Sequence, residues 1–462
     1  MDRSSAVTAS EPTATALPPG PGLPMPVQSA LFLLARDRYL PWCRRRYGNV
    51  FTVRMMGRAP MVVLSDAEHM KRVFSGPANV FHAGEGNEFL RPLLGENSLL
   101  TMDEDAHRRA RRMLMPAFNG AALRRYAETV ATIAGEQVPR WPTGRITALH
   151  PWLQALTLEV ILQVVFGVTD ERRLDRMRPL VRKVTDIGPV TFFSALMPRL
   201  RAYPPARAVW QAAEELDRLL YAEIAERRAA ADLEQRADVL SMMLRAGEGA
   251  DGLSDQELRD ELITLVLAGH ETTATGLAWT FHELARNPRV RELAAEAAER
   301  GDDDYLEAVF KEALRMRPVV YAVARKLTED TDVAGYRIPA GSIVSPSIGL
   351  PHRDARRFDR PEVFDPDRFA SGQPSSTDWL PFGGGIRRCI GAGFSIMEAV
   401  AILRTALREL DFRPDRRRVE PAKGRGVVLV PLRGARLQLR RRYNAASRSR
   451  NVSSPIEPSS SA

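Results

Sequence analysis

The chain has 462 residues, of which 44% are hydrophobic, and its 66 basic and 57 acidic side chains give a formal net charge of +9. That hydrophobic content is ample for a packed core, and two cysteines are too few for a disulfide framework, which favours a cytoplasmic location. No apolar run reaches the ~18–20 residues that span a bilayer, so we expect no membrane anchor. The charge suggests nucleic-acid binding, but no zinc-finger spacing, RNA-binding aromatic pattern or basic zipper accompanies it.

The composition changes only at the two ends of the chain. Residues 1–25 are rich in Ala, Thr, Ser and Pro, and the tail over 444–462 ends in a Ser-rich run, so both are expected to be disordered. No internal repeat or long linker divides residues 26–443. We therefore expect one domain there, although the length alone would permit two or three.

The N-terminal third begins with a predicted β-hairpin over 51–64, which turns at Gly57–Arg58. Residues 80–100 are expected to be irregular, and a loop of that size is usually functional or mobile. Residues 105–113 predict a helix, in which His107 and Arg111 are four apart and share a face.

Helices interrupted by prolines are predicted from about 121 to 245. Ser254 and Glu257 form a capping box, so a helix should begin there and run about 32 residues to Asn287. Gly269 and two threonines weaken the helix propensity in its middle, and hydroxyls inside a helix can bend it.

The C-terminal third carries a predicted helix over 304–317, with Glu312 and Arg315 on one face. Strands are predicted over 326–348, with turns at residues 334–335 and 340–341. A last hairpin is predicted from 427–430 and 435–439, with its turn directed toward a pocket.

Cys389 lies in the glycine-rich, arginine-bearing segment 381–391, just before a predicted helix over 394–403. Nearby cations and the N-terminal amides of a helix favour a thiolate. Glycines on both sides of the sulfur let a flat group lie against the backbone, as a macrocycle with a central iron would. A phosphate loop would need Gly-Lys-Ser/Thr, and a dinucleotide fingerprint would need a glycine where Arg388 stands.

Phe382, Gly385, Arg387, Cys389 and Gly391 resemble the F-x-x-G-x-R-x-C-x-G loop of the cytochrome P-450 superfamily, soluble bacterial type. The resemblance implies that Cys389 is the axial iron ligand of haem b. It also implies that Phe382 and Gly391 contribute to the haem-binding loop.

Three further segments resemble family motifs in the family's order and spacing. Residues 267–273 are similar to A/G-G-x-D/E-T-T/S, which implies that Glu271 and Thr272 are an acid–alcohol pair delivering protons. Glu312 and Arg315 match E-x-x-R, and residues 364–369 resemble the segment that completes a buried ionic triad through Arg368. The family often has Glu where Asp367 stands. By position, the residues expected to bind the haem propionates are His107, Arg111, Arg325 and Arg387.

The resemblance covers about residues 30–442 and implies a mainly α fold with a small β-rich lobe. It implies a monooxygenase that inserts one atom of O2 into an apolar small molecule. No flavin or nicotinamide motif is present, so electrons should come from an acidic ferredoxin or flavodoxin with its NAD(P)H-dependent reductase. A basic docking face is expected to comprise Arg108, Arg109, Arg112, Arg387 and Arg388.

Three alternatives stay open on the sequence: a peroxide-driven enzyme of the same fold, a non-enzymatic haem carrier or sensor, and a basic nucleic-acid-binding protein. The sequence does not indicate the substrate, the physiological redox partner or the oligomeric state. The substrate pocket is expected to involve residues 80–100, 321–324, the last hairpin and a mobile lid near 185–205 that includes Phe192, Phe193, Leu196 and Met197.

Overall fold

The computed structural model describes residues 17–168, 170–185, 191, 194–195, 197–246, 252–372, 374–375 and 378–442. The expected disordered tail over 444–462 and the lid residues Phe192, Phe193 and Leu196 lie outside these ranges. The expected disorder over 1–25 is wrong for residues 17–25, because the backbone there binds the first strand. Thr52 Oγ1 donates to the carbonyl of Pro18 at 2.7 Å, and the Thr52 amide donates to that of Pro19 at 3.0 Å.

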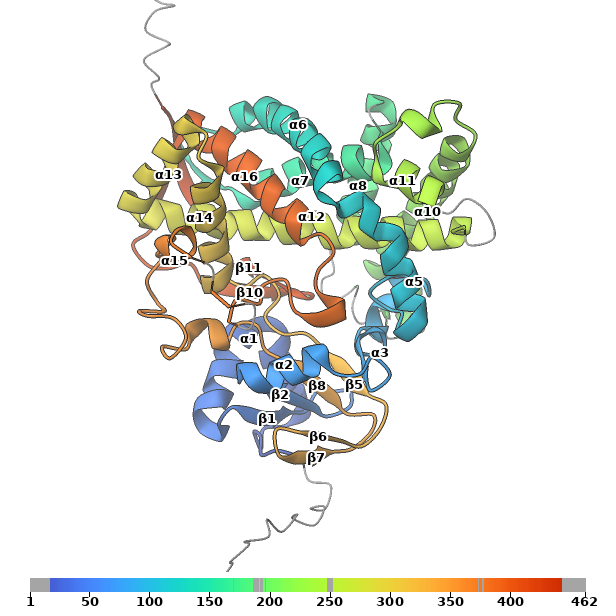
Figure 1. Cartoon of the computed structure of the whole chain (residues 1–462), viewed down its shortest axis with the longest axis vertical. Helices are drawn as coiled ribbons and strands as arrows, with labels where there is room; N and C mark the ends of the chain where they lie inside the picture. The colour runs from blue at the N-terminus through green and yellow to red at the C-terminus, as the bar shows by residue number, and fades with distance from the viewer. Residues whose placement is uncertain are drawn as a thin grey trace, which may run out of the picture.

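Helices form most of the molecule and surround one long helix, α12, which crosses the helical part in Figure 1. The expected capping box is present, with Ser254 as N-cap and Glu257 as its partner, and α12 has the 32 residues that the sequence predicted. The longer helices are α1 (Met25–Tyr47), α2 (Ala67–Ser75), α5 (Glu104–Leu114), α6 (Gly120–Gln137), α7 (His150–Phe166), α8 (Glu171–Thr185), α10 (Ala206–Arg228), α11 (Val239–Ala246), α12 (Asp255–Arg286), α13 (Pro288–Arg300), α14 (Asp303–Met316) and α16 (Ala392–Glu409).

A smaller β-rich part lies below the helices in Figure 1. Its main sheet has the strand order β1-β2-β8-β5-β3, and the predicted hairpin over 51–64 is confirmed by the antiparallel pairing of β1 with β2. A mainly α fold with a small β-rich lobe is therefore confirmed. These strands are β1 (Val50–Val53), β2 (Met61–Leu64), β3 (Phe81–His82), β5 (Arg325–Leu327) and β8 (Ile343–Pro346), with the separate hairpin β6 (Thr331–Val333) and β7 (Tyr336–Ile338).

The predicted last hairpin is wrong. β11 (Val428–Pro431) pairs with β10 (Ala422–Arg425), and β12 (Arg436–Arg441) pairs with β9 (Leu410–Pro414) and β4 (Ile146–Ala148). The chain does turn after Pro431, but the following strand joins another sheet, whose partners lie far away in sequence. A local pattern of apolar residues cannot reveal such a partner, so the sequence favours pairing between adjacent strands.

Residues 80–100 are more ordered than the sequence predicted. The stretch contains β3, two single-turn helices, α3 (Ala83–Gly86) and α4 (Arg91–Leu94), and a 3-10 turn (Glu88–Leu90). Asp103 stabilises the start of α3, because its carboxylate accepts from the amides of Gly84 at 2.8 Å and Glu85 at 2.9 Å. These turns are too short to produce a helical repeat in the sequence.

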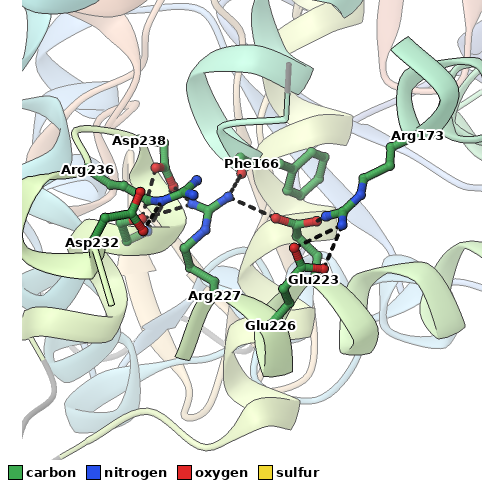
Figure 2. Close-up of polar contacts among 9 residues, drawn as sticks. Phe166, Arg173, Glu223, Glu226, Arg227, Asp232, Arg236 and Asp238 are labelled. Carbon is green, nitrogen blue, oxygen red and sulfur yellow. Dashed lines mark hydrogen bonds and ion pairs between the residues drawn. The ribbon is translucent and has the colours of Figure 1, made fainter. Parts of the chain in front are cut away.

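A buried arginine connects α7, α10 and the start of α11 (Figure 2). Arg227 of α10 donates to the Phe166 carbonyl that ends α7, at 2.7 Å, and to Glu223 at 2.8 Å. It also pairs at 2.5 Å with Asp238, beside the start of α11. Arg227 is 3% exposed, so these two carboxylates compensate its positive charge inside the molecule.

Among the described residues, no single helix is long and apolar enough to cross a membrane. Taken together, α7 and α8 would be long and apolar enough, but the two helices meet at an angle of 118°.

Candidate active site

The loop that carries Cys389 is shaped by close packing against α2. Gly385 has φ +65°, and a Cβ there would lie 1.8 Å from the carbonyl oxygen of Phe74, so only glycine fits. The loop closes where the Cys389 amide donates to the Phe382 carbonyl at 2.9 Å, and the Phe382 ring packs edge-on against Trp379. Gly391 follows as the N-cap of α16. The backbone is thus held in place on both sides of Cys389.

Two opposing influences act on the Cys389 thiol. The side chain is accessible, yet it lies deep enough within the molecule that desolvation raises its pKa. The Gly391 amide and the guanidinium groups of Arg111 and Arg388 oppose that rise. Amides at a helix start and nearby cations are the features that favour a thiolate or a thiolate–metal bond.

Four basic residues from three distant segments gather near this loop. His107 and Arg111 come from α5, Arg325 begins β5, and Arg387 lies two residues before Cys389. Burial, followed by Arg387 and Arg111, lowers the His107 pKa to about 3. Burial also lowers the pKa of Arg325 and of Arg387 to about 10, and Asp103 only partly opposes both shifts. The structure therefore brings together the four residues that the sequence assigned to the propionates.

This cluster fits the carboxylates of haem. His107 is 2% exposed and its Nδ1 has no hydrogen-bond partner among the described residues. The Arg111 guanidinium forms no hydrogen bond or ion pair within the same part of the chain. Cations that lower one another's pKa are stabilised by an anion placed between them. Two carboxylates would supply that charge.

The middle of α12 offers an accessible face where the rest of the helix is covered. Between residues 260 and 285, every residue is buried except Leu267, Ala268, Gly269 and Thr272. Thr272 Oγ1 donates to the carbonyl of Ala268 at 2.6 Å, which is the hydroxyl-to-backbone bond that the threonines predicted. A Cβ on Gly269 would lie 2.7 Å from Ile161 Cδ1, so this glycine also lets α7 pack closely.

Glu271 is 7% exposed and its carboxylate is held by residues from α7 and β10. Gln154 Nε2 donates to Glu271 Oε2 at 2.5 Å, and His150 Nε2 lies 3.7 Å from Oε1. Arg425 Nη1 lies 3.5 Å from the same oxygen and is 30% exposed. Glu271 and Thr272 leave the helix about 100° apart, as consecutive residues must. Glu271 is thus connected toward the molecular surface through Arg425.

The buried ionic triad is confirmed. Arg315 binds Glu312 through two hydrogen bonds of 2.7 and 2.8 Å, and Arg368 Nε lies 3.5 Å from Glu312 Oε1. Glu312 and Arg315 are fully buried. Arg315 also donates to the His352 carbonyl at 2.8 Å, so the pair ties α14 to the chain that leads toward the Cys389 loop.

Sequence reasoning missed four supporting residues. Asp103 connects Arg387 to α3, with a 2.5 Å contact to Arg387 Nη2, while the other three surround Glu271. No motif marks His150, Gln154 and Arg425, because each lies more than 110 residues from Glu271 in the chain. Asp103 could have been suspected as the acidic residue that begins the helix of His107.

Glu398 of α16 should make the protein less stable as the pH rises. It is fully buried, and burial raises its pKa to about 8, which the neighbouring Thr273 hydroxyl opposes only in part. Between the ordinary glutamate value of about 4.3 and this value, the folded state holds a proton that the unfolded state has lost, so stability falls with rising pH.

We therefore expect Glu398→Gln to gain stability relative to wild type, by on the order of 2 kcal/mol between pH 5 and pH 7, because the amide cannot ionise. Urea titrations of both proteins across this pH range measure the difference between their free energies of unfolding. If this difference in free energy did not change with pH, Glu398 would ionise equally in the folded and unfolded states.

A fold with one long central helix, a cysteine loop at the start of the last long helix and a cation cluster beside it defines a haem-thiolate enzyme. The family model described as "Cytochrome P450" matches residues 18–438. The chain therefore belongs to the cytochrome P450 family, and it is a monooxygenase of the kind that binds haem b through a cysteine thiolate.

Similar proteins occur in mycobacteria. The chain is 46% identical over 432 residues to cytochrome P450 135B1 of Mycobacterium tuberculosis, covering 92% of this chain and 91% of that protein. Cytochrome P450 135A1 of the same species is 42% identical over 433 residues, covering 92% and 95%. Both relatives extend over nearly the whole chain, so the family assignment applies to the molecule rather than to one part.

Solved structures share the fold. The retinoic acid-bound cyanobacterial CYP120A1 superposes with a TM-score of 0.80 at 25% identity, covering 93% of this chain and all of that one. The cytochrome P450DA heme domain gives the same TM-score at 24% identity, covering 93% and 98%.

Proposed function

We propose that this chain inserts one atom of O2 into an apolar small molecule, with electrons from a separate protein. The accessible face on α12 carries the proposal: in a helix otherwise buried from 260 to 285, only Leu267, Ala268, Gly269 and Thr272 are open. Three of these four residues offer no charged or strongly polar group. An apolar substrate is thus expected to lie there, beside one hydroxyl.

Haem b is assigned to the space bounded by the Cys389 loop and the basic cluster. In this assignment Cys389 ligates the iron, and the propionates lie among the four cations, His107, Arg111, Arg325 and Arg387. Phe382 and Gly391 shape the loop around the sulfur. Haem held by a thiolate supplies the oxygen-activating chemistry of this family.

Thr272 and Glu271 are proposed to supply protons in sequence. The Thr272 hydroxyl stands on the accessible face and bonds the Ala268 carbonyl, so it can hold a water or accept a bond without leaving the helix. Glu271 is buried, but Arg425 beside it is partly exposed, which offers a route from the surface. Proton delivery by positioned groups of this kind is general acid catalysis.

Thr272→Ala is expected to lower the product formed per NAD(P)H consumed by about tenfold or more, with hydrogen peroxide released in its place. The measurement compares NAD(P)H oxidation, peroxide and product in a reconstituted system with a turned-over substrate. Thr273→Ala is the matched control, because Thr273 is buried and its hydroxyl donates to Ser395 Oγ at 3.1 Å. Unchanged coupling in Thr272→Ala would favour a peroxide-driven enzyme.

The substrate class is proposed from the same face and from one structural relative. CYP120A1 was solved with retinoic acid bound, and at 25% identity its pocket lies in the same fold. An elongated apolar molecule of that kind would suit the apolar residues of α12.

Tyr321 is an exception among the expected pocket residues, because its ring packs in a separate cluster with Tyr39 and Leu40 of α1.

Electrons are proposed to come from an acidic ferredoxin or flavodoxin with its NAD(P)H-dependent reductase, in the cytoplasm, where both cysteines would stay reduced. Arg112 and Arg388 are exposed near the Cys389 loop, and Arg108 is half exposed. The docking face is smaller than expected. Arg387 binds Asp103 inside the molecule, and Arg109 pairs at 2.6 Å with Glu257 at the start of α12.

The rate of reduction by an acidic ferredoxin should fall as ionic strength rises, because salt screens attraction between exposed charges. Stopped-flow reduction at increasing sodium chloride measures this dependence. Arg112→Gln combined with Arg388→Gln should flatten it, whereas Arg413→Gln, an exposed arginine on β9, should not. A rate independent of ionic strength would contradict the docking face.

A further inference from the structure

A cavity lies between the C-terminal half of α1 and the chain that follows β8. It has a volume of about 560 Å³ and is lined by residues of the 37–49 stretch on one side and by Tyr321 and residues of the 349–362 stretch on the other. None of the residues proposed to bind haem or protons lines it. Its volume is within the range of small-molecule sites.

Tyr321 forms the floor of this cavity. Its ring lies so close to Gly349 that a Cβ there would be 2.2 Å from a ring carbon. The side chain is 2% exposed, and its hydroxyl has no hydrogen-bond partner among the described residues. A buried hydroxyl without a partner is destabilising, so a ligand that accepted its hydrogen bond would be favoured.

Asp37 lies near the same floor and is also incompletely bonded. Its Oδ1 is buried and meets no donor in the part of the chain that the structure describes. Burial raises the pKa of this carboxylate, and the nearby Arg38 and Arg353 oppose that rise. A ligand hydroxyl could donate to Asp37 and at the same time present an acceptor to Tyr321.

Positive charge dominates the rim. Four arginines and two carboxylates line the cavity, and two of these arginines, Arg38 and Arg45, are exposed without an ion pair or a side-chain hydrogen bond among the described residues. Arg353 is partly engaged, because its Nη1 lies 3.6 Å from the exposed Glu362 and its Nη2 donates to the Met316 carbonyl at 3.3 Å. Arg44 differs, because it already binds Asp354 at 2.7 Å. The guanidinium groups of Arg38 and Arg45 therefore remain available to a ligand anion, and Arg353 adds positive charge beside them.

We propose that this cavity binds a small hydroxylated molecule that carries a phosphate or carboxylate group. The anion lies between Arg38, Arg45 and Arg353, and the hydroxylated body reaches down to Asp37 and Tyr321. The cavity is far larger than one phosphate ion, so the ligand has a body beyond its anionic group. Tyr321 is almost completely buried, so a small molecule can contact it more readily than the surface of another protein can.

Isothermal titration calorimetry on the haem-loaded protein tests the site with inorganic phosphate, glycerol 3-phosphate and glycerate, at ionic strength held constant with chloride. The two hydroxylated anions distinguish a phosphate source from a carboxylate source. We expect saturable binding of at least one of them. Arg38→Gln combined with Arg45→Gln should weaken it by about tenfold or more, and Tyr321→Phe by about threefold.

Arg46→Gln is the matched control, because Arg46 is an exposed arginine of the same helix that does not line the cavity. It should bind like wild type, and an unchanged carbon monoxide spectrum shows that each variant is folded around haem. The proposal is overturned if none of the three anions binds saturably, or if binding survives both sets of cavity substitutions. Binding of inorganic phosphate alone would contradict the proposal that the ligand has a hydroxylated body.

Discussion

Replacing Cys389 with alanine should abolish the strongly red-shifted Soret band that thiolate-ligated haem gives when it is reduced and exposed to carbon monoxide. The reason is geometric, because the loop closed by the Cys389 amide places this thiol near Arg111 and Arg388, which both oppose the rise of its pKa. The propionate-binding cations remain in the variant. Haem can therefore still associate, with its Soret band at a shorter wavelength.

Cys43→Ala supplies the matched control for this measurement. Cys43 is fully buried in the α1 cluster, and burial raises the pKa of its thiol to about 11, so it is a neutral packing residue. Its loss should cost about 1 kcal/mol of stability and leave the red-shifted band in place. Both variants are measured as dithionite-reduced difference spectra, with haem content determined separately. A band that survives in Cys389→Ala, or vanishes in Cys43→Ala, would refute the assignment of Cys389.

The sequence could predict elements whose causes are local. The capping box at Ser254, the length of α12 and the turn of the first hairpin depend on residues within a few positions of one another, and all three appear as expected. The pairing of β12 depends on β4 and β9, which no neighbouring residue specifies. This is why the last hairpin was assigned to the wrong partners.

The candidate site divides in the same way. Cys389 and the residues of its motif could be found because each family motif is short and contiguous. The supports of Glu271 could not, because Gln154, His150 and Arg425 meet it only after α7 and β10 have packed against α12. The inward turn of Arg387 toward Asp103 likewise depends on the tertiary position of α5. A run of basic letters cannot tell an exposed arginine from one that is already paired.

Arg315→Met should destabilise the protein by about 3–5 kcal/mol, a large part of the 5–15 kcal/mol that holds a typical domain together. The substitution leaves the fully buried Glu312 without its bidentate partner, and Arg368 at 3.5 Å is too distant to replace it. The His352 carbonyl also loses its donor. Urea unfolding of the haem-loaded protein measures the loss, and little folded protein is expected on expression at 37 °C.

The double variant Glu312→Gln with Arg315→Met separates the charge from the packing. Removing both fully buried charges leaves only the Arg368 cation, which is 12% exposed, so the double variant should be less destabilised than Arg315→Met alone. Arg300→Met is the surface comparison, because Arg300 is 62% exposed and lies 3.7 Å from Glu296, four residues earlier on its own helix. Its effect should stay within about 0.5 kcal/mol. Equal stability of Arg315→Met and wild type would mean that Glu312 is held by its remaining neighbours, and that the triad does not stabilise the chain beside the Cys389 loop.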